Sequence, residues 1–401
     1  MNNWLGRKDL TPYIVRSLEQ IADYVESERV DVMVVAGDLF SEKSRDEGIA
    51  RALDELRRIF GPFVARGGII LAVAGNHDSE LQFEGMRHLL SLGAAGSRGR
   101  FEIRADPGFV ALEGAGGERV QFVLMPYPTP RVYGRHDEES VPYSSPEERN
   151  RGTQIRFVQK LEQIKRDWVQ PQFPTVLVSH VHVRGASGHT LYQVTEKEEA
   201  VFDPGQVSLD WAYAAYGHIH KPGPVGGNNF ARYSGSPIAL DLAERHDHKS
   251  CVVFDVDANG VTGDLRLLPL HGPRLHKIQV DATQEAPESF LPRLREQVGE
   301  DFAFCELTFD PSVHNLRVLR QEIERTLPGL YRFGFIEVGH EISTGPISIV
   351  TQENTALEPE VNNALFSDPT LVVRGFLERR LQNHARQADI LALANELMAS
   401  V

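Results

Sequence analysis

The sequence has few cysteines, no long apolar segment and no excess of basic residues. Its 401 residues include two cysteines, Cys251 and Cys305. Two cysteines cannot form a disulfide framework, and this pair lacks the spacing of a metal-binding motif. No apolar run approaches the roughly 18 residues that a membrane-spanning helix needs, and the first residues lack the apolar core of a secretory signal. These absences predict a protein of the reducing cytoplasm that does not enter a membrane.

The charge balance is acidic, with 42 lysines and arginines against 56 aspartates and glutamates, or a net charge of −14. A protein that binds polyanions by bulk attraction carries the opposite charge, so a histone-like or basic-arm binder is excluded. An enzyme that holds nucleic acid at a local basic patch or through metal ions stays compatible with this balance. The length predicts two or three domains of roughly 150 residues each.

Helical and strand patterns alternate in the first part of the chain. Apolar residues recur every three or four positions in 11–28, 46–60 and 81–91, which predicts helices. The segments VDVMVVAGD, IILAVAGNHD and PTVLVSHVH are almost entirely apolar before they end in polar residues, as expected of parallel strands buried on both faces. Shorter strands are expected in 101–125, a long loop in 129–150 and a helix in 151–168. The alternation predicts a layered α/β fold.

The composition changes after Pro269, which suggests how the domains divide. We assign 1–269 to the main layered domain. The pattern of 270–340 predicts a β-α-β-α-β unit, and we interpret it as a second, smaller α/β domain. We interpret 341–368 as a linker, and we expect two helices in the tail 369–401.

Polar side chains follow the predicted buried strands at four places. These are Gly37-Asp38, Gly75-Asn76-His77-Asp78, Ser179-His180 and Gly217-His218-Ile219-His220. In open α/β sheets, ligands bind at the carboxyl ends of the strands. Aspartate, asparagine and histidine without cysteine suit manganese, iron or zinc. Two such ions roughly 3.5–4 Å apart would stabilise the attacking and leaving oxygens of a displacement at phosphorus.

Each of these residues alone has a simpler interpretation. A lone aspartate such as Asp38 is more often a helix N-cap, and a lone histidine such as His180 is more often an ordinary hydrogen-bonded side chain. We interpret His182, His189 and other isolated histidines in that simpler way. The four clusters occur together and in order, each after an apolar run, and this joint occurrence favours a metal site.

The ordered clusters resemble those of the calcineurin-like metallophosphoesterase superfamily. The segments GDLF, GNHD, SHVH, YGHIHKP and RYSGSPIALDLAE are, taken together, similar to the SbcD nuclease family. These motifs cover about residues 31–245. The resemblance implies a metallophosphoesterase fold of mixed sheets flanked by helices, with a capping domain and a helical tail. It also implies a metal-dependent DNA exonuclease and endonuclease of DNA repair and recombination, which acts with an SbcC-type ABC ATPase.

The resemblance also implies roles for the metal ligands. Two divalent ions are expected, with manganese as the first choice. Asp38 would bridge both ions. Asn76, His180 and His218 would complete the shell of one ion, and His220 would bind the other.

Two further residues would take part in catalysis. The resemblance implies that His77 contacts the scissile phosphate or protonates the leaving oxygen. Asp78 would orient the imidazole of His77, because a carboxylate fixes the tautomer of a histidine and raises its basicity.

The sequence departs from the resembled family at its start. Family members begin with an apolar strand that ends in Asp-x-His followed by Leu-Gly, whereas residues 1–6 read MNNWLG, with Asn2 and Trp4 in the aspartate and histidine positions. One metal would then keep only Asp38 and His220 as protein ligands. Either the chain is truncated at a downstream start, or it is a weakened, one-metal form. We favour truncation, because loss of a strand from the middle of a sheet exposes edges that proteins normally pair.

Three functions are weighed on this basis. The first is a metal-dependent DNA phosphodiesterase that docks its ATPase through the tail 369–401 and dimerises through the helices predicted at 46–60 and 81–91. The second is a phosphoesterase of small substrates, which has no need of the residues after Pro269. The third is a catalytically weak DNA-binding or regulatory subunit, which the missing Asp-x-His favours.

Overall fold

The computed structural model describes residues 4–5, 8–40, 46–93, 98–114, 116–134, 143–186, 199–207 and 211–338. Contacts divide the chain into two units, Met1–Thr351 and Gln352–Val401. The predicted linker at 341–368 and the predicted tail at 369–401 lie outside the described residues. Among the described helices, none combines the length and apolarity needed to cross a bilayer.

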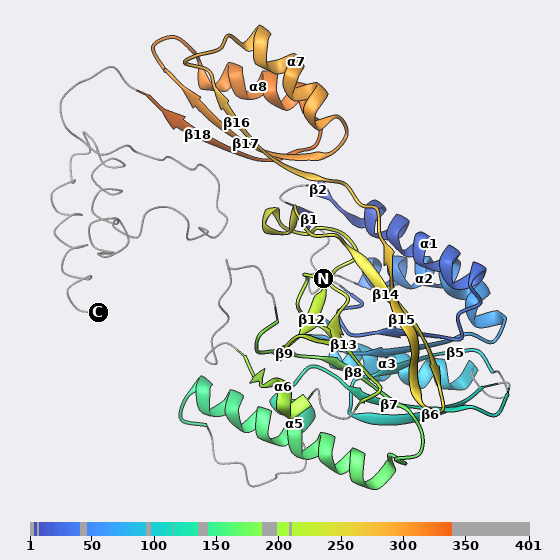
Figure 1. Ribbon diagram of the computed structural model, residues 1–401. Helices are drawn as coiled ribbons and strands as arrows, with labels where there is room; N and C mark the ends of the chain where they lie inside the picture. Colours follow the sequence, from blue (N-terminus) through green and yellow to red (C-terminus); the bar gives the residue numbers. More distant parts are fainter. Residues whose placement is uncertain are drawn as a thin grey trace. The chain divides into compact units, whose positions relative to one another are not determined.

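A three-stranded parallel sheet carries the first two polar clusters. Its strands run in the order β3 (Val32–Val35), β4 (Ile69–Val73) and β5 (Arg100–Arg104). Three helices pack against it (Figure 1): α1 (Thr11–Ser27), α2 (Asp46–Ala65) and α3 (Glu80–Gly93). Phe60 and Phe63 of α2 are buried against Ile70 and Val25, and Phe83 of α3 is fully buried near Ile103.

A six-stranded mixed sheet carries the other two clusters. Its order is β12-β13-β11-β8-β7-β6, and β7, β8, β11 and β13 are parallel. The antiparallel strands β6 and β12 form its edges. The bounds of the six strands are β6 Gly108–Glu113, β7 Arg119–Met125, β8 Thr175–His180, β11 Tyr213–Gly217, β12 Gly223–Val225 and β13 Asn228–Tyr233.

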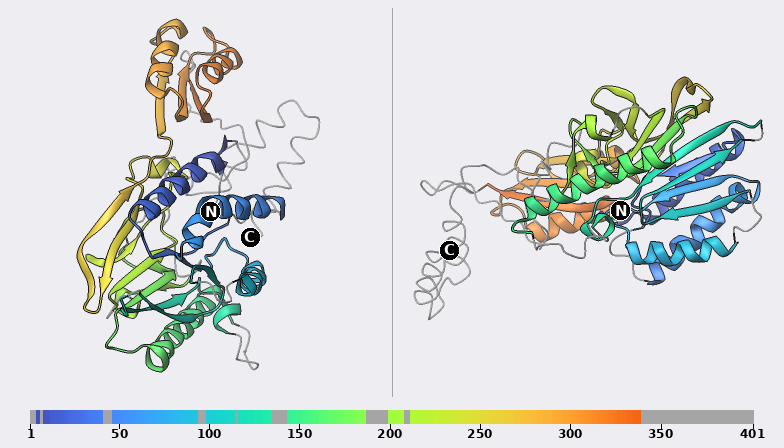
Figure 2. Two further views of the ribbon diagram at one scale, coloured as in Figure 1. Left: turned by 90° about the vertical axis from the view of Figure 1, so that its right-hand side faces the viewer. Right: turned by 90° about the horizontal axis from the view of Figure 1, so that it is seen from below.

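The two sheets face each other, and helices cover their outer faces. Leu71 of β4 packs in one core with Phe122 of β7 and Val178 of β8. The alternate residues of the six-stranded sheet, such as Leu177, pack with Phe157 on the long helix α5 (Pro146–Trp168). Figure 2 shows this arrangement from two further directions. The alternation of inward and outward residues is that of strands buried on both faces, and the predicted layered α/β fold is confirmed.

Shorter elements connect these layers. They are β1 (Trp4–Leu5), β2 (Lys8–Asp9), α4 (Pro130–Tyr133), β9 (His182–Val183), β10 (Val201–Phe202), α6 (Pro204–Val207) and the 3₁₀ helix Leu242–Glu244. A hairpin follows, formed by β14 (Ser250–Asp257) and β15 (Gly260–Pro269). Its two-residue turn is Ala258-Asn259, and Gly260 begins β15 opposite Asp257.

One helix start differs from the sequence prediction. Helix α5 begins at Pro146 rather than at 151, because the hydroxyl of Ser145 accepts a hydrogen bond from Glu148 N at 3.2 Å and caps the helix. Helix α1 begins at Thr11, as predicted, with Leu10 at its N-cap position and no cap from the Leu10 side chain. The carboxylate of Asp9 accepts the Thr11 N–H at 2.9 Å and supplies the missing cap.

The predicted β-α-β-α-β unit after Pro269 is present. Its strands β16 (Leu275–Asp281), β17 (Phe302–Phe309) and β18 (Leu330–Glu337) are parallel and in sequence order. Helices α7 (Pro287–Val298) and α8 (Leu316–Thr326) connect them. These elements share a core of their own, which includes Phe290, Leu307 and Ile323. The assignment of 270–340 as a separate domain stays a prediction.

The helices expected to form a dimer interface bury most of their apolar stripe inside the layered core. Ile49, Phe60 and Phe83 are each less than 10% exposed. Leu53 is 37% exposed and Leu89 is 71% exposed, and they stay available for contact with another chain. Dimerisation therefore stays a prediction, with a smaller apolar surface than the sequence suggested.

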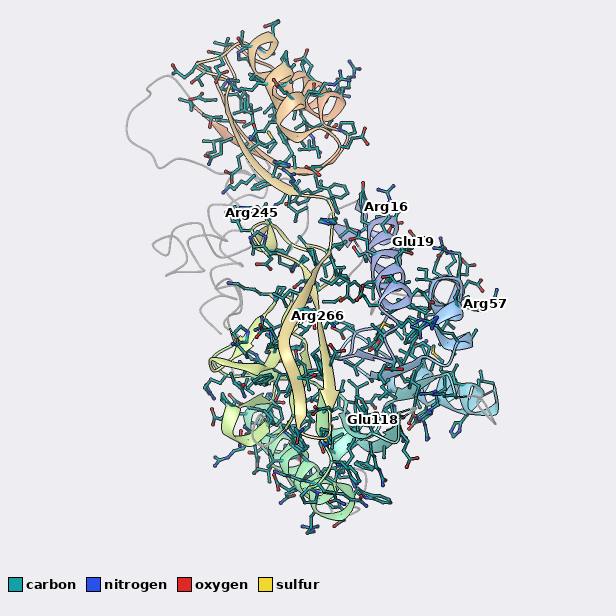
Figure 3. The ribbon with its side chains drawn as sticks, turned by 45° about the vertical axis from the view of Figure 1, so that its right-hand side comes forward. Arg16, Glu19, Arg57, Glu118, Arg245 and Arg266 are labelled. Atoms are coloured by element: carbon teal, nitrogen blue, oxygen red, sulfur yellow. The ribbon has the colours of Figure 1, made fainter. Side chains whose placement is uncertain are left out.

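A large cavity lies beside the free edge of β3. Within the described residues β3 pairs with β4 alone. The cavity has a volume of about 2160 Å³, above the roughly 300–1,000 Å³ of an ordinary ligand pocket. Its lining includes β3, α1 and the β14–β15 hairpin, and Figure 3 labels Arg16 and Glu19 on α1 and Arg266 on β15 among these lining residues. The cavity extends to Asp38, His180 and the loop 217–220.

A buried ion pair fixes the segment that follows the last polar cluster. Lys249 and Glu244 are 7% and 3% exposed, and the Lys249 Nζ donates to Glu244 Oε2 at 2.7 Å. The same ammonium donates to the Ser236 hydroxyl at 2.8 Å and to the carbonyl of His220 at 2.9 Å. Every donor position of the lysine is thus used, and the ion pair holds the loop of His220 against the segment 236–249.

We predict that Lys249→Met lowers the free energy of unfolding by about 3–5 kcal/mol, because it leaves the buried carboxylate of Glu244 without its cation. The control is Lys277→Met, whose ion pair with Glu306 is about one-third exposed and should cost less than about 1 kcal/mol. Urea unfolding followed by circular dichroism measures both. Equal, small losses in the two variants would contradict the structural role of the buried pair.

Candidate metal centre

Four predicted ligands come from the ends of four strands. Asp38 follows β3 and Asn76 follows β4, while His180 ends β8 and His218 follows β11. Each pair of strands is parallel, and Gly217 lies opposite His180 in the sheet register. Because both sheets present their carboxyl ends at the same place, side chains from distant parts of the sequence meet there.

Glycine permits this close approach of the two sheets. Gly37 has a φ of +92°, and a Cβ at this position would overlap the His180 ring. A Cβ at Gly75 would overlap the carboxylate of Asp38. Asp38 itself has a φ of +56°, a left-handed conformation that costs free energy in a residue other than glycine. The glycines in these motifs therefore have a steric task, beyond making turns.

The hydrogen bonds of His180 decide which ring nitrogen faces the site. Its Nδ1 donates to the carbonyl of Ala36 at 2.7 Å. The other nitrogen, Nε2, lies 2.9 Å from Asn76 Oδ1 and 3.5 Å from Asp38 Oδ2. Burial lowers the pKa of His180 to about 4, so the ring is neutral at pH 7. A neutral ring that donates through Nδ1 has its lone pair on Nε2, the state that a metal ligand requires.

The donor set fits a divalent cation. With the asparagine amide in the orientation shown, the lone pair of His180 Nε2 faces the oxygen of Asn76 at hydrogen-bond distance. His218 Nδ1 also lies 3.1 Å from this oxygen. Acceptors that face one another repel unless a cation lies between them. One carboxylate, one amide oxygen and two imidazoles could hold manganese, iron or zinc.

Asp38 is buried but keeps its negative charge. Burial would raise the pKa of this carboxyl, but the interaction with His180 and a hydrogen bond from the His77 backbone lower it below its ordinary value. The His77 N–H donates to Asp38 Oδ1 at 3.0 Å. This bond places His77 next to the proposed ligands, and its catalytic role stays a prediction.

Asp78 joins the loops that carry the first two clusters. Its carboxylate accepts hydrogen bonds from the backbone N–H groups of Leu39 at 3.1 Å, Phe40 at 2.8 Å and Gly75 at 2.8 Å. Burial raises the pKa of Asp78 although these three bonds oppose the rise. Asp78 therefore holds the loop after β3 against the turn after β4. Its predicted orientation of the His77 imidazole stays a prediction.

The structure adds Glu199, which the sequence analysis did not identify. Its carboxylate lies 2.9 Å from His218 Nε2 and 2.8 Å from His182 Nδ1. The Tyr127 hydroxyl donates to it at 3.3 Å. Burial opposes ionisation, but the hydrogen bonds from the two histidines lower the pKa of Glu199 to about 2. Glu199 belongs to the acidic run EKEEA, which by sequence is typical of a solvated loop.

His220 stands apart from the other predicted ligands in its contacts. Its Nδ1 lies 2.8 Å from Glu244 Oε1, and its side chain is 37% exposed. Burial opposes ionisation of Glu244, but the bonds from His220 and Lys249 lower its pKa to about 2. His220 lines the same cavity as Asp38 and His180. Asn2, at the position of the missing aspartate, lies outside the described residues.

Comparisons with known proteins agree with the motifs. The sequence profile described as "Calcineurin-like phosphoesterase" matches residues 11–222. Two curated proteins, each named as the D subunit of the nuclease SbcCD, are 24% identical to this chain. The protein of Staphylococcus epidermidis (strain ATCC 12228 / FDA PCI 1200) aligns over 251 residues, 60% of each chain, and that of Bacillus subtilis (strain 168) over 269 residues, 59% of each. This chain thus spans about three-fifths of the length of the curated relatives that it matches.

A solved structure, TT1561 of Thermus thermophilus, is similar over 64% of this chain and 93% of its own, with a TM-score of 0.35 and 11% identity. The sequence match carries the assignment, because it covers more than half of the chain and contains all four polar clusters, through His220. The chain belongs to the calcineurin-like phosphoesterase family of metal-dependent hydrolases.

Proposed function

We propose that the chain is a DNA nuclease that hydrolyses phosphodiester bonds with divalent cations, manganese first among them. The observation that carries the proposal is the convergence of Asp38, Asn76, His180 and His218 at the carboxyl ends of two facing sheets. The relatives named as nuclease subunits support a nucleic-acid substrate, and we propose that it is DNA. We further propose exonuclease activity on DNA ends and endonuclease activity on single strands or hairpins, in DNA repair and recombination.

Different residues bind the cations and contact the phosphate in the proposed reaction. Asp38, Asn76, His180 and His218 hold one cation, and Asp38 and His220 contribute to a second. Bound cations supply charge that stabilises the attacking and leaving oxygens at phosphorus. The bond from His77 N–H to Asp38 Oδ1 supports a position of His77 next to the proposed ligands, and its imidazole would face the reacting phosphate. There it contacts the phosphate or gives a proton to the leaving oxygen.

We propose that a strand added beside β3 would complete the second cation shell. A strand that preceded β1, β2 and α1 would form a β-α-β unit with β3, and such crossovers are parallel and right-handed. Its carboxyl end would then lie at the edge of the sheet that carries Asp38. The cavity that borders β3, α1 and Asp38 has room for it. The Asp-x-His that the resembled family carries there would complete the second cation shell.

Assays on two substrates separate the proposed nuclease from its alternatives. Cleavage of plasmid DNA in manganese, with little hydrolysis of para-nitrophenyl phosphate esters, supports the nuclease. The reverse preference supports a small-substrate phosphoesterase. DNA binding without either activity, also after an N-terminal strand is added, supports a regulatory subunit.

We predict that His77→Ala lowers DNA cleavage by about 10²-fold or more, the usual contribution of a positioned acid or base. Metal content, measured by mass spectrometry, should stay unchanged because the imidazole of His77 is not a proposed ligand. His180→Ala is the control that should lose metal. Equal metal loss in both variants would contradict this division of roles.

We predict that the 401-residue chain needs high manganese for DNA cleavage, because Asp38 and His220 alone hold the second cation weakly. An added N-terminal apolar strand that ends in Asp-x-His should restore cleavage at micromolar manganese. The control is the same strand ending in Asn-x-Ala, which fills the cavity without adding the ligands. Equal manganese requirements for the two extended variants would refute the proposed completion of the shell.

We also propose that residues 369–401 dock an SbcC-type ATPase, that the chain pairs as a homodimer through α2 and α3, and that it works in the cytoplasm. The curated relatives are named as one subunit of SbcCD, which supports a partner subunit of the SbcC type. Leu53 of α2 and Leu89 of α3 are exposed apolar residues that a dimer could cover.

We predict that deletion of residues 369–401 abolishes co-purification with the ATPase. Metal content should not change, because every proposed ligand lies between residues 38 and 220. A truncated chain that still co-purifies with the ATPase would place the docking surface elsewhere.

A further inference from the structure

A second group of ligand atoms lies on the far side of His218 from Asn76. The side chains of His182, Glu199 and His218 place one ligand atom each within 4.8 Å of one another. We propose that these three residues form a cation site of the zinc type, and that it shares His218 with the centre at Asp38. The inference extends the proposed function, but it is tested by metal binding alone.

The chemistry of the group suits zinc. Two imidazoles and one carboxylate, with a further position left for water, form a common three-ligand zinc set. His182 Nδ1 lies 2.8 Å from Glu199 Oε1, and His218 Nε2 lies 2.9 Å from Glu199 Oε2. Both oxygens of one carboxylate are therefore turned toward an imidazole nitrogen.

Burial makes a carboxylate without a counter-charge energetically unfavourable at the position of Glu199. The side chains of Glu199, His218 and His182 are 8%, 15% and 19% exposed. A buried charge is normally paired or coordinates a metal. The ion pairs of Glu199 within the described residues are with these two histidines, whereas the buried Glu244 is paired with Lys249. A cation between the two rings would supply the positive charge that pairs with the carboxylate of Glu199.

The two ring nitrogens of His218 give a stronger argument. Its Nδ1 lies 3.1 Å from Asn76 Oδ1, and its Nε2 lies 2.9 Å from Glu199 Oε2. A neutral imidazole has one N–H, so it can donate to only one of these two oxygens. At the other nitrogen a lone pair then faces an oxygen acceptor, and a proton or a metal ion must satisfy that contact. A neutral His218 therefore offers a lone pair to one side only, and a cation on each side requires that the ring also give up its remaining N–H proton.

The backbone holds the three residues in fixed positions. His182 begins β9, which pairs in parallel with β10 shortly after Glu199, with His182 opposite Val201. His218 follows β11 and has a φ of +100°, an uncommon conformation that the surrounding structure must impose. Tyr127 OH donates to Glu199 Oε2 at 3.3 Å and orients the carboxylate. Such supporting contacts are typical of a built metal site.

Zinc binding at pH 8 tests the proposal, because protons then compete less for the imidazoles. The number of bound Zn²⁺ ions is measured by mass spectrometry under native conditions and by calorimetric titration. His182→Ala removes one ligand of the proposed site without touching those of the Asp38 centre, and Asp38→Asn weakens that centre alone. The control is His276→Ala, because His276 is 20% exposed and bonds to a carboxylate, Asp301, at 3.1 Å in the unit after Pro269.

We expect the unaltered chain and His276→Ala to bind about two Zn²⁺ ions, one more tightly than the other. His182→Ala and Asp38→Asn should each bind about one, and His220→Ala should still bind two. His182→Asn, checked for folding by circular dichroism, should behave like His182→Ala. Unchanged zinc binding in both His182 variants would overturn the proposal. Unchanged binding in Asp38→Asn would instead count against the centre on which the proposed nuclease function rests.

Discussion

The hydrogen bond from His180 Nδ1 to the carbonyl of Ala36 joins the carboxyl ends of the two sheets. The bond requires a close approach of the two sheets at the candidate centre. It fixes the tautomer of His180, so that Nε2 faces Asn76 and Asp38. It also leaves no space for a side chain at Gly37. By holding the two sheets together, the bond fixes the positions of the proposed ligand atoms.

The same packing makes the candidate centre depend on the edge strand β3. The edge of β3 is free within the described residues, and the cavity beside it reaches the ligand atoms. A site built at strand ends depends on every strand that ends there. The proposed second cation therefore depends on what fills this cavity, whereas the proposed ligands of the first cation, from β3, β4, β8 and β11, already lie together.

Much of the fold and of the centre could be predicted from the sequence, because apolar runs that end in GD, GNHD, SH and GHIH give both the strands and their functional ends. Glu199 could not be predicted in this way. Glu199 comes from an acidic run. It reaches the site because β10 pairs with β9, and no sequence pattern predicts this contact. The start of α5 was missed because Ser145 caps it from within a segment that reads as loop.

The limit of periodicity is visible in α2 and α3. The spacing of Ile49, Phe60 and Phe83 predicts an apolar face, but it cannot say whether the sheet or a second chain covers that face. In the structure these three residues are buried in the chain's own core. Leu89 on the same pair of helices is 71% exposed. Only burial, which depends on the tertiary fold, separates the two kinds of residue.

The most direct test of the central claim is anomalous diffraction from crystals of the chain soaked in manganese. The account predicts an anomalous peak that contacts Asp38, Asn76, His180 and His218 together. The His180 Nδ1 bond to Ala36 should be kept, because it holds the ligating tautomer. A map without a peak at these four residues, at manganese concentrations that support DNA cleavage, would contradict the account.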